Sequence, residues 1–207
     1  MNDDYQKQVV EAMIFASDSP LSENKISACV EGLSKRRISE IVEELNSDYS
    51  KSNRAFFITR VAAGFQFNSH KEFAPWIKKL YKGRAKPRLS QAALESLAII
   101  TFKQPIAKSE VDAIRGVNSG GVIKNLLERN LVCISGRSDS VGKPLLYSTT
   151  TDFLIYFGLN DLSELPKPRE IAEIMGTAEQ NQEISGVIVE ALTELEANQH
   201  GNNDKAE

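Results

Sequence analysis

The sequence is poor in the residues that support metal binding, disulfide formation and nucleophilic catalysis. Only two cysteines and two histidines occur among 207 residues. Cys29 and Cys133 lie far apart in apolar-periodic segments, so we expect buried free thiols in a cytoplasmic protein and no disulfide framework. His70 and His200 form no metal-ligand spacing and no serine–histidine–aspartate arrangement. We therefore expect no metal, no cofactor and no enzymatic activity.

Long apolar runs and a large excess of one charge are missing as well. No stretch approaches the roughly 20 apolar residues of a membrane span, and the N-terminus lacks the basic-then-apolar pattern of a signal peptide. A net charge of -3 gives no overall attraction to nucleic acid. With 41% hydrophobic and 26% charged residues, the composition predicts an ordinary cytoplasmic globular protein of one or two domains, without membrane contact.

The first part of the chain predicts three helices, a hairpin and a fourth helix. In the first helix we assign Val9, Met13 and Ala16 to the core face, with Val10 and Ile14 beside them. Ser22 and Ser34 are predicted caps of the second and third helices. The third helix carries a core stripe at i, i+3, i+4 and i+7, formed by Ile38, Ile41, Val42 and Leu45. Two β-rich runs around Ala63–Gly64 predict a hairpin, and an amphipathic stretch closes the unit near Tyr81.

The second part repeats this order. Ser90 is the predicted cap of a helix that ends at Gln104–Pro105, and a short helix follows that stops at Gly116. Ser119 is the predicted cap of the third helix, and a hairpin with a longer glycine-bounded loop comes next. Asp152 is the predicted cap of the closing helix, before Gly158.

This repetition predicts a mainly helical α+β fold with two tandem winged-helix (helix-turn-helix) domains, at 1–83 and 89–166. A polar linker at 84–88 joins them, and a partly disordered tail follows from 167 to 207. A short amphipathic helix near 184–196 gives this tail one apolar stripe. The stripe either docks on the chain's own domains or is covered by a partner or a second copy.

The predicted helix-turn-helix of the second part has features of two kinds of site, a phosphate-binding loop and a DNA-reading helix. Gly116 and Gly121 have the spacing of a phosphate-binding loop, but Val122 and Ile123 stand where lysine and serine or threonine are required. A DNA-reading helix needs outward basic or amide side chains, which this helix offers beside an acidic one, Glu128. In the first part, three glutamates follow the basic start of the third helix, at Glu40, Glu43 and Glu44. We therefore expect at most weak, non-specific DNA contact.

The second part resembles one family closely. The segment "LSQAALESLAIITFKQPIAKSEVDAIRGVNS" is followed by "LLERNLV", "GR", "GKPLLYSTTTDFLIYFGL" and "LSELP". Together they are similar to the segregation and condensation protein B (ScpB) family over 89–166, whereas 1–83 is similar in layout and in "EAMIFASDSPLS". Gly120, Gly121 and Asn130 depart from the family pattern.

The resemblance implies a non-enzymatic subunit of a condensin-like complex, which acts in chromosome condensation and partition during cell division. It implies a homodimer that forms through the first domain, and binding of a kleisin (ScpA-like) subunit through both domains. The protein would contact the SMC ATPase through the kleisin and would stabilise the complex of the kleisin with the SMC heads. Its location would be cytoplasmic and nucleoid-associated. A dimeric winged-helix transcription regulator is the alternative.

Candidate contact residues follow from the same comparison. Six residues match the family's sequence before the third helix or in its wing, and we predict that they bind the partner. They are Arg115, Asn118, Ser119, Arg137, Lys143 and Pro144. Each residue also has a local structural explanation. Ile14 and Phe15 are apolar beyond what the assigned core face of the first helix requires. We predict that these two residues form the dimer contact.

Overall fold

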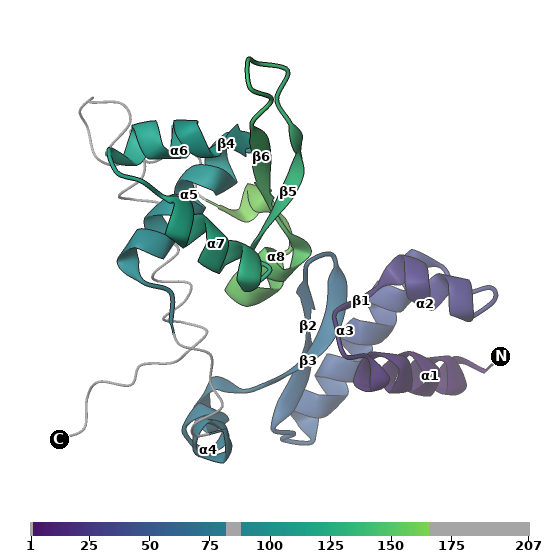
Figure 1. The fold of residues 1–207 in the computed structure, drawn as a ribbon. Coiled ribbons are helices and arrows are strands. Elements are labelled where there is room, and N and C mark those ends of the chain that lie inside the picture. The colour runs from purple at the N-terminus through teal and green to yellow at the C-terminus, as the bar shows by residue number, and fades with distance from the viewer. Residues whose placement is uncertain (1, 82–87, 166–207) are drawn as a thin grey trace, which may run out of the picture. The chain divides into compact units, whose positions relative to one another are not determined.

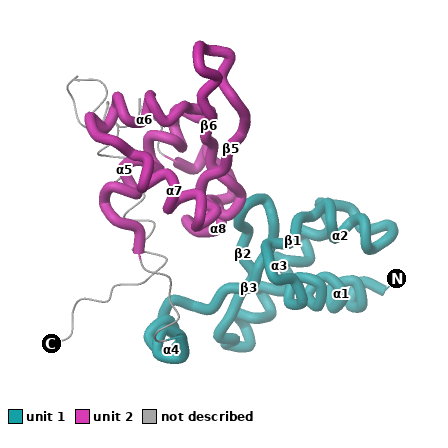
Figure 2. The backbone as a smooth tube through the Cα atoms, in the orientation of Figure 1, with its two compact units in different colours: residues 1–85 teal, residues 86–207 magenta. Residues whose placement is uncertain are grey.

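The computed structural model describes residues 2–81 and 88–165. Two compact units, Met1–Ala85 and Lys86–Glu207, make up the chain (Figure 2). Each described unit combines helices with a small three-stranded antiparallel sheet, so the prediction of a mainly helical α+β protein is confirmed. The predicted tail helix at 184–196 and nearly all of the linker 84–88 lie outside the described residues.

Unit 1 follows the predicted order of elements, with one short strand added (Figure 1). The elements are α1 (Asp3–Ala16), β1 (Leu21–Ser22), α2 (Glu23–Cys29), α3 (Lys35–Lys51), β2 (Phe56–Val61), β3 (Gly64–Ser69), the 3-10 turn η1 (Lys71–Phe73) and α4 (Ala74–Leu80). The strand order is β1-β3-β2. The hydroxyls of Ser22 and Ser34 accept backbone N–H groups at the starts of α2 and α3, which confirms both predicted caps.

The core of unit 1 lies between its first three helices and the inner face of the sheet. The predicted stripe of α3 is confirmed, because Ile38, Ile41, Val42 and Leu45 are all buried. In α1 the assigned core face is only partly correct: Val9 and Met13 are partly buried against the core, Val10 and Ile14 are fully buried, and Ala16 is exposed. Residues at i and i+4 share one helix face, and this face of α1 packs toward α3.

Ile14 is therefore a core residue and not a spare one. It is 2% exposed, so the prediction that it forms a dimer contact is wrong for this reason. Phe15 is the next residue along the helix and points about 100° away from it. It is 78% exposed, so its ring remains available at the surface.

The β2–β3 hairpin closes through a two-residue turn at Ala62–Ala63, both with positive φ. Gly64, which was expected in the turn, instead begins β3 and pairs with Ser22 of β1. A Cβ at Gly64 would lie 2.7 Å from the carbonyl carbon of Pro20, so glycine is needed here for a close approach between backbones.

A side chain of α3 closes the outer edge of this sheet. The Asn46 amide nitrogen donates to the carbonyl oxygen of Ile58 at 2.8 Å, and the Ile58 N–H donates to the Asn46 amide oxygen at 2.8 Å. An amide side chain thus takes the place of a neighbouring strand beside β2. Satisfied edge groups discourage the addition of a foreign strand at this point.

Unit 2 repeats the same order of elements (Figure 1). Its elements are α5 (Gln91–Lys103), β4 (Ile106–Ala107), α6 (Lys108–Arg115), α7 (Gly120–Glu128), β5 (Val132–Arg137), β6 (Leu145–Thr149), α8 (Thr151–Phe157) and the 3-10 turn η2 (Leu162–Glu164). The strand order is β4-β6-β5. Helix α5 is the centre of the unit, since most of its residues are buried.

The helix ends of unit 2 follow the predictions in part. Ser90 caps α5 as predicted. The hydroxyl of Thr150, and not the predicted Asp152, caps α8 by accepting the N–H of Phe153 at 3.1 Å. Ser119 occupies the cap position of α7 without a capping bond from its hydroxyl, and this prediction is wrong in its chemistry.

Both cysteines are free and exposed, which corrects the expectation of buried thiols. Cys29 lies in the last turn of α2, three residues beyond the buried Ile26. Cys133 follows the buried Val132 on β5, and adjacent residues of a strand point to opposite faces. An apolar-periodic segment buries only part of its residues, and each cysteine lies outside that part.

Candidate protein-binding surfaces

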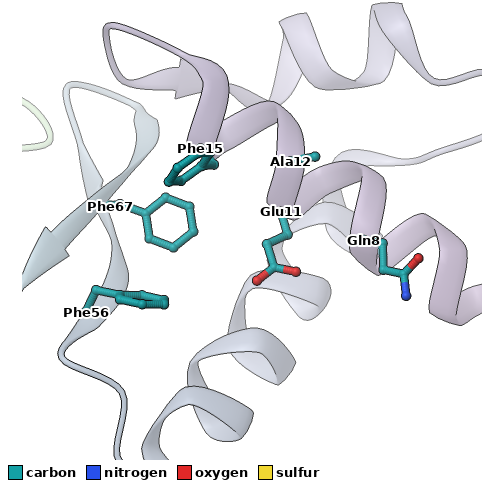
Figure 3. Close-up of a pocket in the computed structure, with 6 residues that line it drawn as sticks. All are labelled: Gln8, Glu11, Ala12, Phe15, Phe56 and Phe67. Carbon is teal, nitrogen blue, oxygen red and sulfur yellow. The ribbon is translucent and has the colours of Figure 1, made fainter.

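Unit 1 carries an apolar groove between α1 and the β2–β3 hairpin. Its volume is about 520 Å³. The residues that line it are Gln8, Glu11, Ala12, Phe15, Phe56 and Phe67 (Figure 3). We call this hollow the aromatic groove. Three phenylalanines from two distant parts of the chain make it, and the groove is a feature of the folded unit that no single sequence segment displays.

The rings of the aromatic groove pack edge to face. The Phe15 and Phe67 ring centroids are 6.0 Å apart at 82°, and those of Phe56 and Phe67 are 5.6 Å apart at 72°. Tyr49 of α3 extends the cluster, with its centroid 5.1 Å from that of Phe56. Such edge-to-face contacts stabilise the arrangement of the rings, which together form an apolar surface.

A polar contact beside the aromatic groove joins α3 to α1. The Tyr49 hydroxyl donates to a carboxylate oxygen of Glu11 at 2.5 Å. Burial of the phenol, followed by its hydrogen bond to Glu11, raises the pKa of Tyr49 well above the usual range. The phenol therefore stays protonated and keeps donating at physiological pH.

A second, more polar hollow of about 470 Å³ adjoins the groove and shares Gln8, Glu11 and Phe56 with it. It adds Asp4 and Asp48 to the lining, together with basic side chains that include Lys7. The Lys7 ammonium donates to Asp48 and lowers the pKa of that carboxyl. Charged side chains therefore line the adjoining hollow, whereas phenylalanine rings line much of the aromatic groove.

In unit 2, three of the predicted partner-binding residues form a frame around the turn between α6 and α7. The Arg115 guanidinium donates to Glu95 of α5 at 3.1 Å, and its side chain is only 8% exposed. Ser119 is fully buried, and its backbone N–H donates to Asp112 at 2.7 Å. The Asn118 amide oxygen accepts the N–H of Gly120 at 2.8 Å. These side chains are largely engaged within the unit.

The exposed apolar residue of this turn is Val117. It is 55% exposed, between Gly116 with its positive φ and the engaged Asn118. The Lys108 ammonium and the Ser119 N–H both donate to Asp112 and lower the pKa of its carboxyl. The Asp112 carboxylate therefore stays ionised and keeps accepting both hydrogen bonds. The sequence offered little sign of Val117, because an isolated valine beside a glycine has no periodicity.

The other three predicted residues lie together at the base of the β5–β6 loop. The Arg137 guanidinium donates to the carbonyl oxygen of Lys143 at 3.1 Å, and the Ser138 N–H donates to that of Pro144 at 2.9 Å. These bonds close the loop and present Val141, which is fully exposed, at its tip. The exposure of Val141 was not predicted from the sequence either.

Among residues 2–81 and 88–165, no cluster of histidine, cysteine, aspartate and glutamate has the geometry to hold a metal ion. A search of the same residues finds no helix that is long and apolar enough to cross a membrane. The features that stand out in this part of the chain are exposed apolar residues beside networks of hydrogen bonds.

Fold and surfaces together define a two-unit α+β protein with exposed apolar surfaces. The family described as segregation and condensation complex subunit ScpB matches residues 8–168, across both units. The chain belongs to the segregation and condensation protein B family. The likeness is wider than the sequence motifs indicated, because it includes nearly all of unit 1.

The chain is similar to proteins of this family from several bacteria. The chain is 39% identical to segregation and condensation protein B of Syntrophotalea carbinolica, over 84% of this chain and 87% of that protein. It is 41% identical to the Geobacillus kaustophilus protein of the same name, over 81% and 77%. The crystal structure of ScpB from Mycobacterium tuberculosis is 28% identical, with a TM-score of 0.37, and covers 77% of this chain and 98% of that one.

Proposed function

We propose that this chain is a non-enzymatic subunit of a condensin-like SMC–kleisin complex. In this proposal it binds an ScpA-like kleisin, stabilises the kleisin's complex with the SMC heads, and acts on the nucleoid in the cytoplasm. The observation that carries the proposal is the family match through both units, at residues 8–168. The apolar docking surfaces of the two units fit the role of an adaptor between proteins.

We further propose that each unit is a winged-helix domain, with dimerisation in 1–83 and a second domain in 89–166. In both units, three helices precede a hairpin, and a short strand pairs with the second strand of that hairpin. This is the arrangement expected of a helix-turn-helix followed by a wing. The tail from 167 to 207 lies outside both proposed domains.

The homodimer is proposed to form through the aromatic groove of unit 1. Phe15 is 78% exposed and Phe56 is 38% exposed, and both rings line the groove. Large apolar side chains that gather on one surface mark an interaction site more reliably than scattered ones. Of the two residues first assigned to the dimer contact, the proposal retains Phe15 alone.

The kleisin is proposed to contact unit 2 through the two rigid loops. In this view Arg115, Asn118 and Ser119 hold Val117 outward, while Arg137, Lys143 and Pro144 hold Val141 outward. Loops that are already ordered lose little entropy on binding, which favours capture of a flexible segment. Binding by both units would also raise the effective concentration of the second contact.

Co-expression with an ScpA-like kleisin tests the proposal. We expect one complex whose mass, from light scattering after size exclusion, contains the kleisin and two copies of this chain. The double variant Val117→Asp, Val141→Asp should weaken kleisin binding about tenfold or more and leave the homodimer intact. Lys25→Asp, on the exposed side of α2, is the matched control. A chain that never co-elutes with a kleisin would contradict the proposal.

A dimeric transcription regulator receives less support from the helices that would read DNA. On α7, Lys124 lies 3.8 Å from Glu128, and on α3 Arg36 and Arg37 pair with glutamates at 3.0 Å and 2.7 Å. Carboxylates at these positions would approach phosphates closely and reduce affinity. A sequence-specific footprint that Lys124→Ala abolishes would favour the regulator.

A further inference from the structure

The last helix of unit 1 has an apolar side that the described residues of the unit leave largely exposed. Residues at i, i+3, i+4, i+7 and i+8 form one stripe, which consists of Phe73, Trp76, Ile77, Leu80 and Tyr81. Trp76 is 66% exposed, Leu80 is 78% exposed and Tyr81 is 53% exposed. No residue of α4 is buried. The helix packs mainly against η1, the single turn before it.

Such a helix is unstable by itself. Seven residues make about two turns, and isolated helices shorter than about 12 residues are marginal in water. Amphipathic helices of this length draw most of their stability from the surface that covers the apolar side. The stripe of α4 therefore calls for a complementary apolar surface.

Unit 1 itself contains a surface of that kind. Its other exposed large apolar side chains, in the described residues, are Tyr5, Phe15 and Phe56, and the last two line the aromatic groove. Glu11 is the charged residue of the groove, and the adjoining hollow adds Asp4 and Asp48. Helix α4 contains two lysines and no acidic residue. The adjoining hollow also contains Lys7 and Arg54, so the charge of opposite sign to the lysines of α4 is that of Glu11 in the groove itself. The groove and the helix are thus both apolar, with one carboxylate in the groove and basic charge on the helix.

The path of the chain favours exchange between two copies. Ser69, the last residue of β3, pairs with Phe56, and the N–H of His70 donates to the carbonyl oxygen of Ala55. The chain therefore leaves the sheet beside the groove, but α4 lies beyond the end of β3, away from α1 (Figure 1). The connector between them is the 3-10 turn η1, which has no spare residues for a return. Short connectors of this type favour swapping of the element that follows them.

We propose that α4 is exchanged in the homodimer, so that α4 of each copy lies in the aromatic groove of the second copy. This inference rests on the proposed homodimer and specifies its contact. The exchange is reciprocal and closed, because each copy supplies one helix and one groove. It covers the apolar stripe of α4 and the rings of Phe15 and Phe56 in the same step.

Disulfide trapping between differently tagged full-length chains tests the exchange. Cys29→Ser and Cys133→Ser remove the two exposed native thiols. One chain then carries Ala12→Cys in the groove, and the other carries Leu80→Cys or Tyr81→Cys on α4. After subunit exchange and mild oxidation, mass spectrometry counts cross-links between and within chains. The control chain carries Glu31→Cys, which is exposed between α2 and α3, in place of Ala12→Cys.

We expect cross-links between Ala12→Cys and at least one α4 position to exceed those of the control about tenfold or more, because disulfides need close Cβ atoms. The double variant in one chain should cross-link mainly into dimers. Internal cross-links in a monomer would overturn the exchange, since α4 would then lie in its own groove. A dimer by light scattering without excess cross-links would overturn it too. A parent chain that is monomeric would overturn the homodimer itself.

Discussion

The two units share one order of elements but treat their last helix in opposite ways. In unit 2, α8 buries Phe153 and Phe157 completely. In unit 1, α4 buries nothing and exposes Trp76 and Leu80. Helix α8 follows its sheet directly, with Thr150 as the cap between them, whereas η1 separates α4 from β3. The same topology therefore gives one unit whose last helix belongs to the core and one whose last helix, in the described residues, keeps apolar side chains exposed.

The largest expected effect comes from breaking the completed core of unit 2. Phe157→Ala should destabilise the protein by about 3–5 kcal/mol, because it leaves a cavity where a ring was fully buried. Leu80→Ala on α4 should change the free energy of unfolding of the dilute monomer by less than about 0.5 kcal/mol. Urea denaturation of both variants measures the difference. Similar losses for the two would remove the distinction between the closing helices.

The next effect concerns self-association through unit 1. Ala12→Arg places a long cation in the aromatic groove and should weaken the dimer about 100-fold, or roughly 2–3 kcal/mol. Ala28→Arg makes the same change at an exposed position of α2, outside the groove, and should leave the dimer intact. Sedimentation over a dilution series gives both dissociation constants. Equal weakening by the two variants would mean that charge alone, and not the groove, controls association.

A third pair of changes compares one glycine in each of the two units. Gly64→Ala should destabilise unit 1 by about 1–3 kcal/mol, since its Cβ would lie 2.7 Å from the backbone of Pro20. Gly121→Ala in α7 meets nothing within 4 Å and should stabilise unit 2 by about 0.5–1 kcal/mol. Thermal unfolding of both variants would reveal opposite signs. A neutral Gly64→Ala would show that β1 can move away from β3.

The smallest effect is a pH dependence in unit 1. The pKa of Tyr49 is raised in the folded state, so above about pH 10, the usual tyrosine pKa, the unfolded chain loses this proton first. The unfolded state then binds fewer protons than the folded one, and stability falls as pH rises. The free energy of unfolding of Tyr49→Phe should fall less steeply than that of the parent protein between pH 9 and pH 11, as measured by urea denaturation at each pH. Parallel slopes for the two proteins would count against a protected phenol.

Sequence periodicity predicted the helices whose apolar residues occupy one narrow stripe. Ile38, Ile41 and Leu45 of α3 are an example, and all three are buried. The core face of α1 was assigned only partly correctly, because Val9 through Ala16 place apolar residues around most of the circumference of the helix. Periodicity cannot choose among several apolar faces, and the choice depends on packing against α3.

The binding surfaces were less predictable than the fold. Phe15, Phe56 and Phe67 come from three separate elements, and only the folded hairpin brings the last two beside α1. An excess of apolar residues in α1 was the one available signal, and it identified Phe15 correctly as an exposed ring while misplacing Ile14. Family motifs pointed to Arg115 and Ser119, whose side chains the structure buries.

Helix α4 also gives this protein a built-in optical signal. Trp76 is the only tryptophan in the chain, and its indole stands largely in water, 4.8 Å beneath the ammonium of Lys79. Indole emission moves to shorter wavelengths when water around the ring is replaced by apolar side chains. The tryptophan emission of the unlabelled protein therefore reports the surroundings of α4, and a shift to shorter wavelengths on self-association would mark the burial of this helix.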